Sequence, residues 1–152
     1  MSDGYLIESV TVEVDAPQAL VWEVLVDYAR YPEWNPYTVR VDTRLEVGAD
    51  VHLHLPSPDK PGETMVTTEV MRVIDAPHHL QYDTAENLPG IFAVRDQWVE
   101  DLGGGRSSYR TTDVFSGEYA KAAYEMTGDW VKQGFDAVAH ALKARAEALH
   151  RA

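Results

Sequence analysis

Alternating apolar and polar residues run through most of the chain, a period typical of strands that are buried on one face. In the segment from Tyr5 to Val14, the side chains of Leu6, Val10, Val12 and Val14 fall on one side. Clusters of Gly, Pro and Asp separate the later segments, as turns do between sequential strands. The pattern predicts six more strands, at 37–46, 49–55, 63–75, 79–84, 91–101 and 106–116.

Three segments have helical spacing instead. Apolar residues recur every three or four positions from Pro17 to Asp27, a short helical turn fits Pro32 to Asn35, and one long amphipathic helix is predicted from Glu118 to His150. The inward stripe of this last helix is expected to hold Ala120, Ala123, Thr127, Trp130, Val131, Gly134, Val138, Leu142 and Leu149.

The order of elements predicts an α+β protein in which residues 1–152 form one domain. About seven sequential antiparallel strands would bury one face of a sheet against the long C-terminal helix. The two short helices between the first and second strands must then return the chain from one sheet edge to the other.

Charge and composition narrow the classes of partner. The net charge of −12 and the lack of a basic patch argue against nucleic acid, and no apolar run is long enough for a membrane span. The chain has no Cys, which excludes disulfides and thiolate chemistry. The first ten residues, MSDGYLIESV, do not have the form of a secretory signal, so we expect a cytoplasmic protein.

Several local sequences resemble the START-like (SRPBCC) superfamily and, within it, the polyketide cyclase/dehydrase family. They are Val12-Glu13-Val14-Asp15-Ala16-Pro17, Val21-Trp22, Asp27, Tyr31-Pro32-Glu33-Trp34-Asn35-Pro36, the hairpin from Gln97-Trp98 to Gly105, and Phe115-Ser116-Gly117. The resemblance implies a helix-grip fold like that of the birch pollen allergen, with a curved sheet wrapped around the long helix. It also implies a cavity for a hydrophobic molecule, while leaving the function open, because this fold hosts enzymes, lipid carriers and chaperone regulators.

The last two strands decide which side chains would face that cavity. A simple pairing across Gly103-Gly104-Gly105 sets Trp98 against Tyr109 and predicts one aromatic inward face. A slip of one residue would reverse this assignment. The inward face would comprise Phe92, Val94, Asp96, Trp98, Tyr109, Thr111, Asp113 and Phe115, with Ala93, Arg95, Gln97, Arg110 and Thr112 on the other face.

The expected ligand pocket combines this face with the helix stripe and the family signature. Its residues are Trp34, Phe92, Val94, Trp98, Thr111, Phe115, Thr127, Trp130, Val131, Gly134 and Val138. Asp113, Tyr82 and Tyr109 are candidates for proton transfer, although Asp113 has the alternative of a solvated place at the rim. Gly134 either leaves room for a ligand or lets the helix pack closely on the sheet.

Other polar residues have structural interpretations. His52 and His54 alternate as metal ligands can, but no third ligand is evident, so we predict no metal site and a solvent-facing pair. Trp34 is expected to plug one end of the core, and Asn35 to satisfy backbone groups of its turn. No nucleotide or cofactor motif occurs, so no cofactor is expected.

Three functions fit these observations. The first is binding of a hydrophobic or aromatic small molecule, with lipids among the candidates. The second is a polyketide cyclase, aromatase or dehydratase that uses the same pocket, and the third is a protein-interaction or regulatory module. Whether the protein is an enzyme stays open at this point, and a homodimer is compatible with the sequence.

Overall fold

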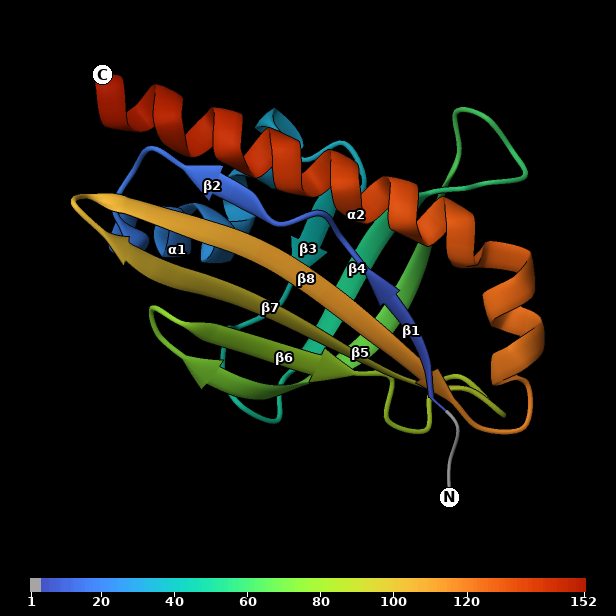
Figure 1. The fold of residues 1–152 in the computed structure, drawn as a ribbon. Helices are drawn as coiled ribbons and strands as arrows, with labels where there is room; N and C mark the ends of the chain where they lie inside the picture. Colours follow the sequence, from blue (N-terminus) through green and yellow to red (C-terminus); the bar gives the residue numbers. More distant parts are fainter. Residues whose placement is uncertain (1–3) are drawn as a thin grey trace.

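A long C-terminal helix lies along one face of an eight-stranded antiparallel sheet in the computed structural model, which describes residues 4–152 (Figure 1). The strands are β1 (Tyr5–Glu8), β2 (Val12–Val14), β3 (Arg40–Asp42), β4 (Asp50–Pro56), β5 (Thr64–Asp75), β6 (His79–Asp83), β7 (Phe92–Gly103) and β8 (Arg106–Ser116). The helices are α1 (Gln18–Val26), the 3-10 helix η1 (Tyr28–Glu33) and α2 (Ala120–Arg151). This is the expected α+β helix-grip fold.

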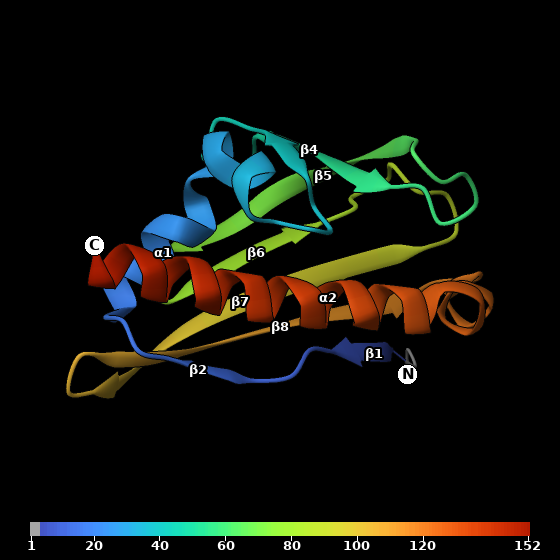
Figure 2. The same cartoon turned by 90° about the horizontal axis from the view of Figure 1, so that it is seen from above.

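The order of strands across the sheet is β1-β8-β7-β6-β5-β4-β3, and β2 also pairs with β8. The helices α1 and η1 therefore carry the chain from one sheet edge to the other, as the order of elements predicts. Viewed from above, α2 lies between the β1/β2 edge and the strands β4 and β5 (Figure 2). The sheet and α2 thus enclose the space in which the core and the candidate site lie.

The first strand is divided in two, which the alternation pattern did not predict. Ile7 pairs with Asp113 and Val12 with Tyr109, so the register on β8 shifts by one residue between β1 and β2. The side chains of Ile7 and Val12 are both buried although they are five positions apart, whereas Leu6 is 53% exposed. The prediction that Leu6 shares the face of Val12 is therefore wrong.

The strand predicted at 37–46 is shortened to β3, because its first residues are held in a turn. The side-chain oxygen Oδ1 of Asn35 accepts the backbone N–H groups of Tyr37 at 3.0 Å and Thr38 at 2.8 Å. Asn35 therefore accepts hydrogen bonds from backbone groups of its turn, as predicted. The turn directs the Tyr37 ring toward α2, which matters for the cavity described below.

The pairing of β7 with β8 differs from the predicted one by a single residue. Trp98 pairs with Arg110, and Val99 with Tyr109. The shift has a local cause: Gly104 and Gly105, both at positive φ, form a two-residue turn, and a bulge lies between Asp101 and Gly103. On β8 the predicted inward residues do face α2. On β7 the assignment is reversed, and the inward residues are Ala93, Arg95, Gln97 and Val99.

The inward face of α2 follows the predicted stripe in part, and Gly128, Ala139 and Ala146 are buried although the predicted stripe did not contain them. Phe135, which was not in the predicted stripe, is buried, and Leu149 is 44% exposed because it lies in the last turn of the helix. The buried residues of α2 are Ala120, Gly128, Val131, Phe135, Val138, Ala139, Leu142 and Ala146. The small residues among them let the C-terminal half pack closely against α1 and the sheet, while larger side chains stand over the sheet further toward the N-terminus.

Candidate functional site

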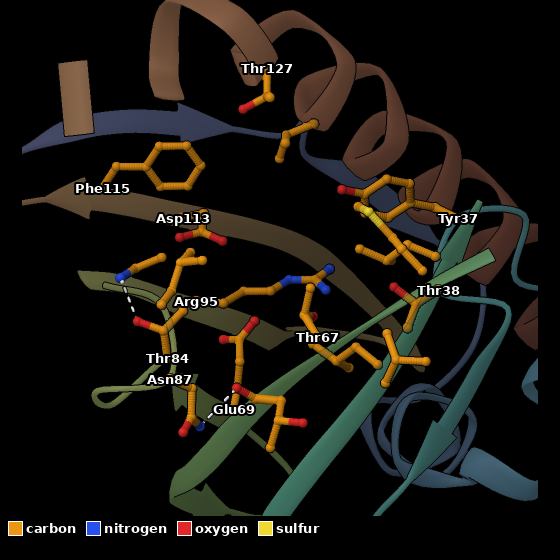
Figure 3. Close-up of a pocket in the computed structure, with 18 of the residues that line it drawn as sticks. Tyr37, Thr38, Thr67, Glu69, Thr84, Asn87, Arg95, Asp113, Phe115 and Thr127 are labelled. Atoms are coloured by element: carbon orange, nitrogen blue, oxygen red, sulfur yellow. Dashed lines mark hydrogen bonds between the residues drawn. The ribbon is translucent and has the colours of Figure 1, made fainter. Parts of the chain in front are cut away.

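A cavity of about 630 Å³ lies between the inner face of the sheet and the N-terminal half of α2 (Figure 3). Most of its lining is apolar, and its volume lies in the range of roughly 300–1,000 Å³ that is usual for small-molecule sites. The lining residues are Tyr37, Thr38, Leu53, Leu55, Met65, Val66, Thr67, Thr68, Glu69, Thr84, Asn87, Leu88, Ala93, Arg95, Asp113, Phe115, Thr127, Trp130, Val131 and Phe135.

Strand alternation explains which sheet residues reach the cavity. Successive side chains of a strand point to opposite faces, so every second residue of β4, β5, β7 and β8 faces α2. Val66 and Thr68 of β5 also border the cavity, although they alternate with these residues. The strand pairings bring the residues that face α2 into rows: Leu53 lies opposite Thr67, Leu55 opposite Met65, and Ala93 opposite Phe115. Ala93, a small residue among larger neighbours near the start of β7, leaves space for the cavity above it.

Aromatic rings on and beside α2 form one wall. The Tyr37 ring is edge-on to Trp130 at 5.2 Å and to Phe135 at 6.0 Å between centroids. Gly134 lies directly behind Tyr37, where a Cβ atom would be only 2.3 Å from Cδ1 of the ring. Of the two interpretations of Gly134, close packing is therefore the one observed, and the group packed against it is Tyr37.

Arg95 is the charged group at the floor of the cavity, although its side chain is only 6% exposed. Its Nε–H donates to the Thr111 hydroxyl at 3.1 Å, and its Nη1 donates to the Tyr82 hydroxyl at 3.0 Å. The guanidinium carbon lies 4.4 Å from the centre of the Phe135 ring, in cation–π geometry. Neutral groups therefore hold this buried cation in place.

Two carboxyl groups flank Arg95. Asp113 pairs with Arg95 across β7 and β8, and Glu69 reaches the cavity from β5. Burial raises the pKa of Asp113 to about 7, with Arg95 opposing the shift. Burial, and then repulsion from Asp113, raise the pKa of Glu69 well above its usual range. Oδ1 of Asp113 and Oε1 of Glu69 are buried and accept no hydrogen bond from the described residues.

The other two candidates for proton transfer, Tyr82 and Tyr109, lie beneath the cavity rather than in its lining. Tyr82 is the β6 neighbour of Arg95, and its hydroxyl accepts the hydrogen bond from the guanidinium. The Tyr109 hydroxyl donates to Oε1 of Gln97 at 2.6 Å. Burial raises the pKa of both phenols. Their evident role is to support Arg95 and the floor.

The structure divides the expected pocket residues into three groups. Four of the predicted residues line the cavity, namely Phe115, Thr127, Trp130 and Val131. Outside its lining, in the core around it, are Trp34, Thr111, Gly134 and Val138. The placement of Phe92, Val94 and Trp98 was wrong, because the register shift turns these β7 residues to the outer face.

On that outer face Trp98 has partners of its own. The His79 ring stacks on Trp98 at 5.2 Å, and the Arg110 guanidinium lies 4.0 Å from its ring centre. Asp96, predicted to point inward, instead bonds His79 at 2.5 Å and accepts from Gln81 at 2.9 Å. The aromatic character that suggested a pocket wall is thus explained by stacking on the outer surface.

Sequence reasoning missed Arg95, Glu69, Tyr37, Met65 and Ala93 as cavity residues. Arg95 and Ala93 had been assigned to the outer face by the same register error. For Glu69 a signal existed, because it alternates with Met65, Thr67 and the buried Met71 along β5. Tyr37 had been assigned to a strand, and no sequence feature indicated that its ring would turn toward Gly134.

Residues 4–152 contain neither a cluster of metal-ligating side chains nor a membrane-spanning helix. No group of three or more His, Asp or Glu side chains in this range could hold a metal ion. His52 bonds the Thr68 hydroxyl at 3.0 Å and His54 bonds Asp42 at 3.1 Å, so each has an ordinary protein partner. Across the same range, no helix is long and apolar enough to cross a bilayer.

The fold and the cavity define a START-like helix-grip protein, and comparison with solved structures agrees. The aromatase/cyclase Zhui from Streptomyces sp. R1128 superposes with a TM-score of 0.77 at 26% identity, over 95% of this chain and 94% of that one. A START superfamily protein from Mycobacterium smegmatis gives 0.73 at 16% identity, over 96% and 99%. Norcoclaurine synthase from Thalictrum flavum gives 0.70 at 16%, over 100% and 99%.

The family follows from the sequence match. The model of the family described as "Polyketide cyclase / dehydrase and lipid transport" matches residues 8–147, so the chain belongs to this family. No curated protein matches the chain.

Proposed function

We propose that the protein binds a hydrophobic small molecule, aromatic in part, in the cavity between the sheet and α2. The observation that carries the proposal is the apolar cavity of about 630 Å³ with one buried cation at its floor. A well-packed core of this size would have filled such a space with side chains, because protein interiors rarely keep voids larger than a water molecule.

Membership of a family described by cyclase, dehydrase and lipid transport activities supports a ligand of this kind. The rings of Tyr37, Trp130, Phe135 and Phe115 offer faces and edges against which an aromatic body can pack. The bound molecule would displace solvent from largely apolar walls, which is the main source of affinity in such sites.

Binding is tested with the neutral fluorescent probe N-phenyl-1-naphthylamine and two variants of adjacent α2 residues. Thr127→Phe places a ring in the cavity, whereas Met126→Phe changes a side chain that is 83% exposed. We expect Thr127→Phe to lower probe affinity at least about tenfold, equivalent to ~1.4 kcal/mol, and Met126→Phe to leave it unchanged. Equal effects of the two variants, or a wild-type protein that fails to bind the probe, would contradict the proposal.

A second candidate function is cyclisation and dehydration of a polyketone chain bound in the same cavity. The observation that favours it is Asp113, a cavity carboxyl with a pKa of about 7 and an unpartnered oxygen, which suits both proton removal and proton donation. Identity of 26% with an aromatase/cyclase adds support.

The proposed reaction is an intramolecular aldol condensation. Asp113 would remove a proton from a carbon between two carbonyl groups, and the enolate carbon would form a bond to a more distant ketone carbon. Asp113 would return its proton to the resulting alkoxide. Removal of the second proton from the carbon between the carbonyl groups and departure of the hydroxyl group, which together make up one water molecule, then give the ring double bond. Arg95 would stabilise the enolate oxygen.

Asp113→Asn tests this role, since it keeps the size of the side chain but cannot accept the proton. Turnover of a synthetic polyketone thioester should fall about 100-fold or more while probe affinity stays the same. Unchanged turnover would remove Asp113 from the mechanism. Tyr82→Phe and Tyr109→Phe serve as comparisons, because these hydroxyls lie outside the cavity lining.

A further inference from the structure

The partners of Arg95 differ from those of the arginines that form ion pairs in this chain. Arg30, Arg40 and Arg72, for example, each lie within 4 Å of a carboxylate oxygen. Within residues 4–152 Arg95 has no ion pair of this kind, and its side chain donates hydrogen bonds to the hydroxyls of Thr111 and Tyr82. A buried charge without a counter-charge is costly, so this arrangement is unusual unless something else supplies the counter-charge.

We infer that the cavity ligand carries an anionic oxygen group, such as a carboxylate, on its hydrophobic body and that this group pairs with Arg95. The inference rests on the proposed binding function and specifies the chemistry of the molecule bound. A guanidinium has five N–H donors, of which two have hydroxyl acceptors here, and its planar fork suits the two oxygens of a carboxylate.

The groups already on the protein do not supply this counter-charge by direct pairing. Asp113 is the strand partner of Arg95, but its free Oδ1 atom accepts nothing from the guanidinium. Oε1 of Glu69 is likewise buried and unpartnered. In their neutral forms these carboxyl groups can donate O–H hydrogen bonds to an anion seated beside Arg95, and so they would add to its binding site.

The pH of the test has to be chosen so that these carboxyl groups are protonated. The titratable groups around Arg95 are Glu69 from β5, Tyr82 from β6, Asp113 and Tyr109 from β8, Tyr37 before β3, and Tyr28 and Tyr31 from η1, with Asp96 on the far side of β7. From α2 the neighbour is the uncharged Phe135. At pH 6 the Asp113 carboxyl, whose pKa burial raises to about 7, is mostly protonated, and burial shifts the pKa of Glu69 in the same direction, so Arg95 is the dominant charge facing the ligand.

The test compares 2-naphthoate with 2-naphthamide, which have the same ring system and nearly the same shape but differ in charge. Both are titrated at pH 6 as competitors of N-phenyl-1-naphthylamine, against the wild-type protein and Arg95→Met. We expect naphthoate to bind the wild type about 10- to 100-fold more tightly than naphthamide, as a charge-assisted pair does. In Arg95→Met this preference should fall to about one.

Each outcome bears on a defined claim. If the probe binds but naphthoate and naphthamide compete equally, the anion inference is overturned while the binding function stands. If the preference persists in Arg95→Met, the anion is held elsewhere and the inference is also overturned. If the wild type binds neither the probe nor the naphthalenes, the proposed function itself fails.

A second variant guards against a trivial loss of folding. Arg95→Met leaves the Tyr82 hydroxyl without its donor, whereas Thr111 keeps a partner because its hydroxyl donates to the Asp96 carbonyl at 2.7 Å. The double variant Arg95→Met/Tyr82→Phe removes the unpaired hydroxyl, and a cooperative urea unfolding transition checks that it is folded. The same loss of naphthoate preference in this double variant supports the inference, and a retained preference contradicts it.

Discussion

Gly134 offers a sharp test of how α2 meets the Tyr37 ring. In Gly134→Ala the new Cβ atom would lie 2.3 Å from Cδ1, 2.5 Å from Cε1 and 2.7 Å from Cγ of Tyr37. Real Cβ atoms do not approach other atoms so closely, so the ring has to move. Its backbone is held by the Asn35 side chain and its ring by Trp130, which makes that movement costly.

The expected magnitude is the sum of two opposing effects. Alanine in place of glycine within a helix stabilises by about 1 kcal/mol, whereas overpacking of a buried site costs about 1–3 kcal/mol. Gly134→Ala should therefore destabilise the protein by ~1 kcal/mol. Gly128→Ala is the matched control on the same helix, because its Cβ would meet Tyr124 at an ordinary 3.4 Å. This control should gain up to ~1 kcal/mol.

Urea unfolding of the two variants measures the difference, and thermal midpoints should differ by roughly 4–8 °C. The cause is checked in the Tyr37→Ala background, where the ring is absent and Gly134→Ala should become stabilising. We also expect Gly134→Ala to weaken probe binding, since the displaced ring borders the cavity. Equal stabilisation by Gly134→Ala and Gly128→Ala would refute the reasoning.

Two further predictions concern the strands β7 and β8. The Asp113 carboxyl holds its proton in the folded protein up to about pH 7, against 3.8 for its ordinary value, so the folded state binds more protons between these limits. The free energy of unfolding should therefore fall by on the order of 4 kcal/mol as pH rises through this interval. Urea unfolding of Asp113→Asn at several pH values should show a weaker dependence of this free energy on pH than the wild type shows. An equal dependence in the two proteins would contradict this prediction. Phe115→Ala should cost about 3 kcal/mol because the ring is buried, whereas Phe92→Ala, at a ring 41% exposed, should cost less than about 0.5 kcal/mol. Because the register predicted from sequence turns both rings inward, a cost at Phe92 as large as that at Phe115 would restore that register.

The order of elements and the layering were predictable because they depend on periodicities that the sequence displays directly. Alternation places Asp113 and Phe115 on one face of β8 whatever the neighbouring strand does. The face of β7 could not be fixed in the same way. Three consecutive glycines can adopt several turns, and the bulge before Gly103 changes the pairing by one residue.

The cavity was harder to predict than the sheet, since it depends on which side chains fail to fill a space. The small side chain of Ala93 and the turn that directs Tyr37 against Gly134 create it, and these residues come together only in three dimensions. Arg95 gave no signal of its own, because arginine is rarely buried and its alternation with Ala93 and Gln97 fits either face. The register alone decides that it points inward.

Methionine methyl groups provide the most direct test of the central claim that a ligand occupies this cavity. Met65 lines the cavity, Met71 is buried in the core outside it, and Met126 is exposed on α2. In protein labelled with ¹³C-methyl methionine, titration with 2-naphthoate should shift the Met65 resonance and give intermolecular NOEs from its methyl group to the naphthalene ring. Met126 should show neither effect. Ring-current shifts at Met126 with an unchanged Met65 signal would place the ligand outside the cavity and contradict the account.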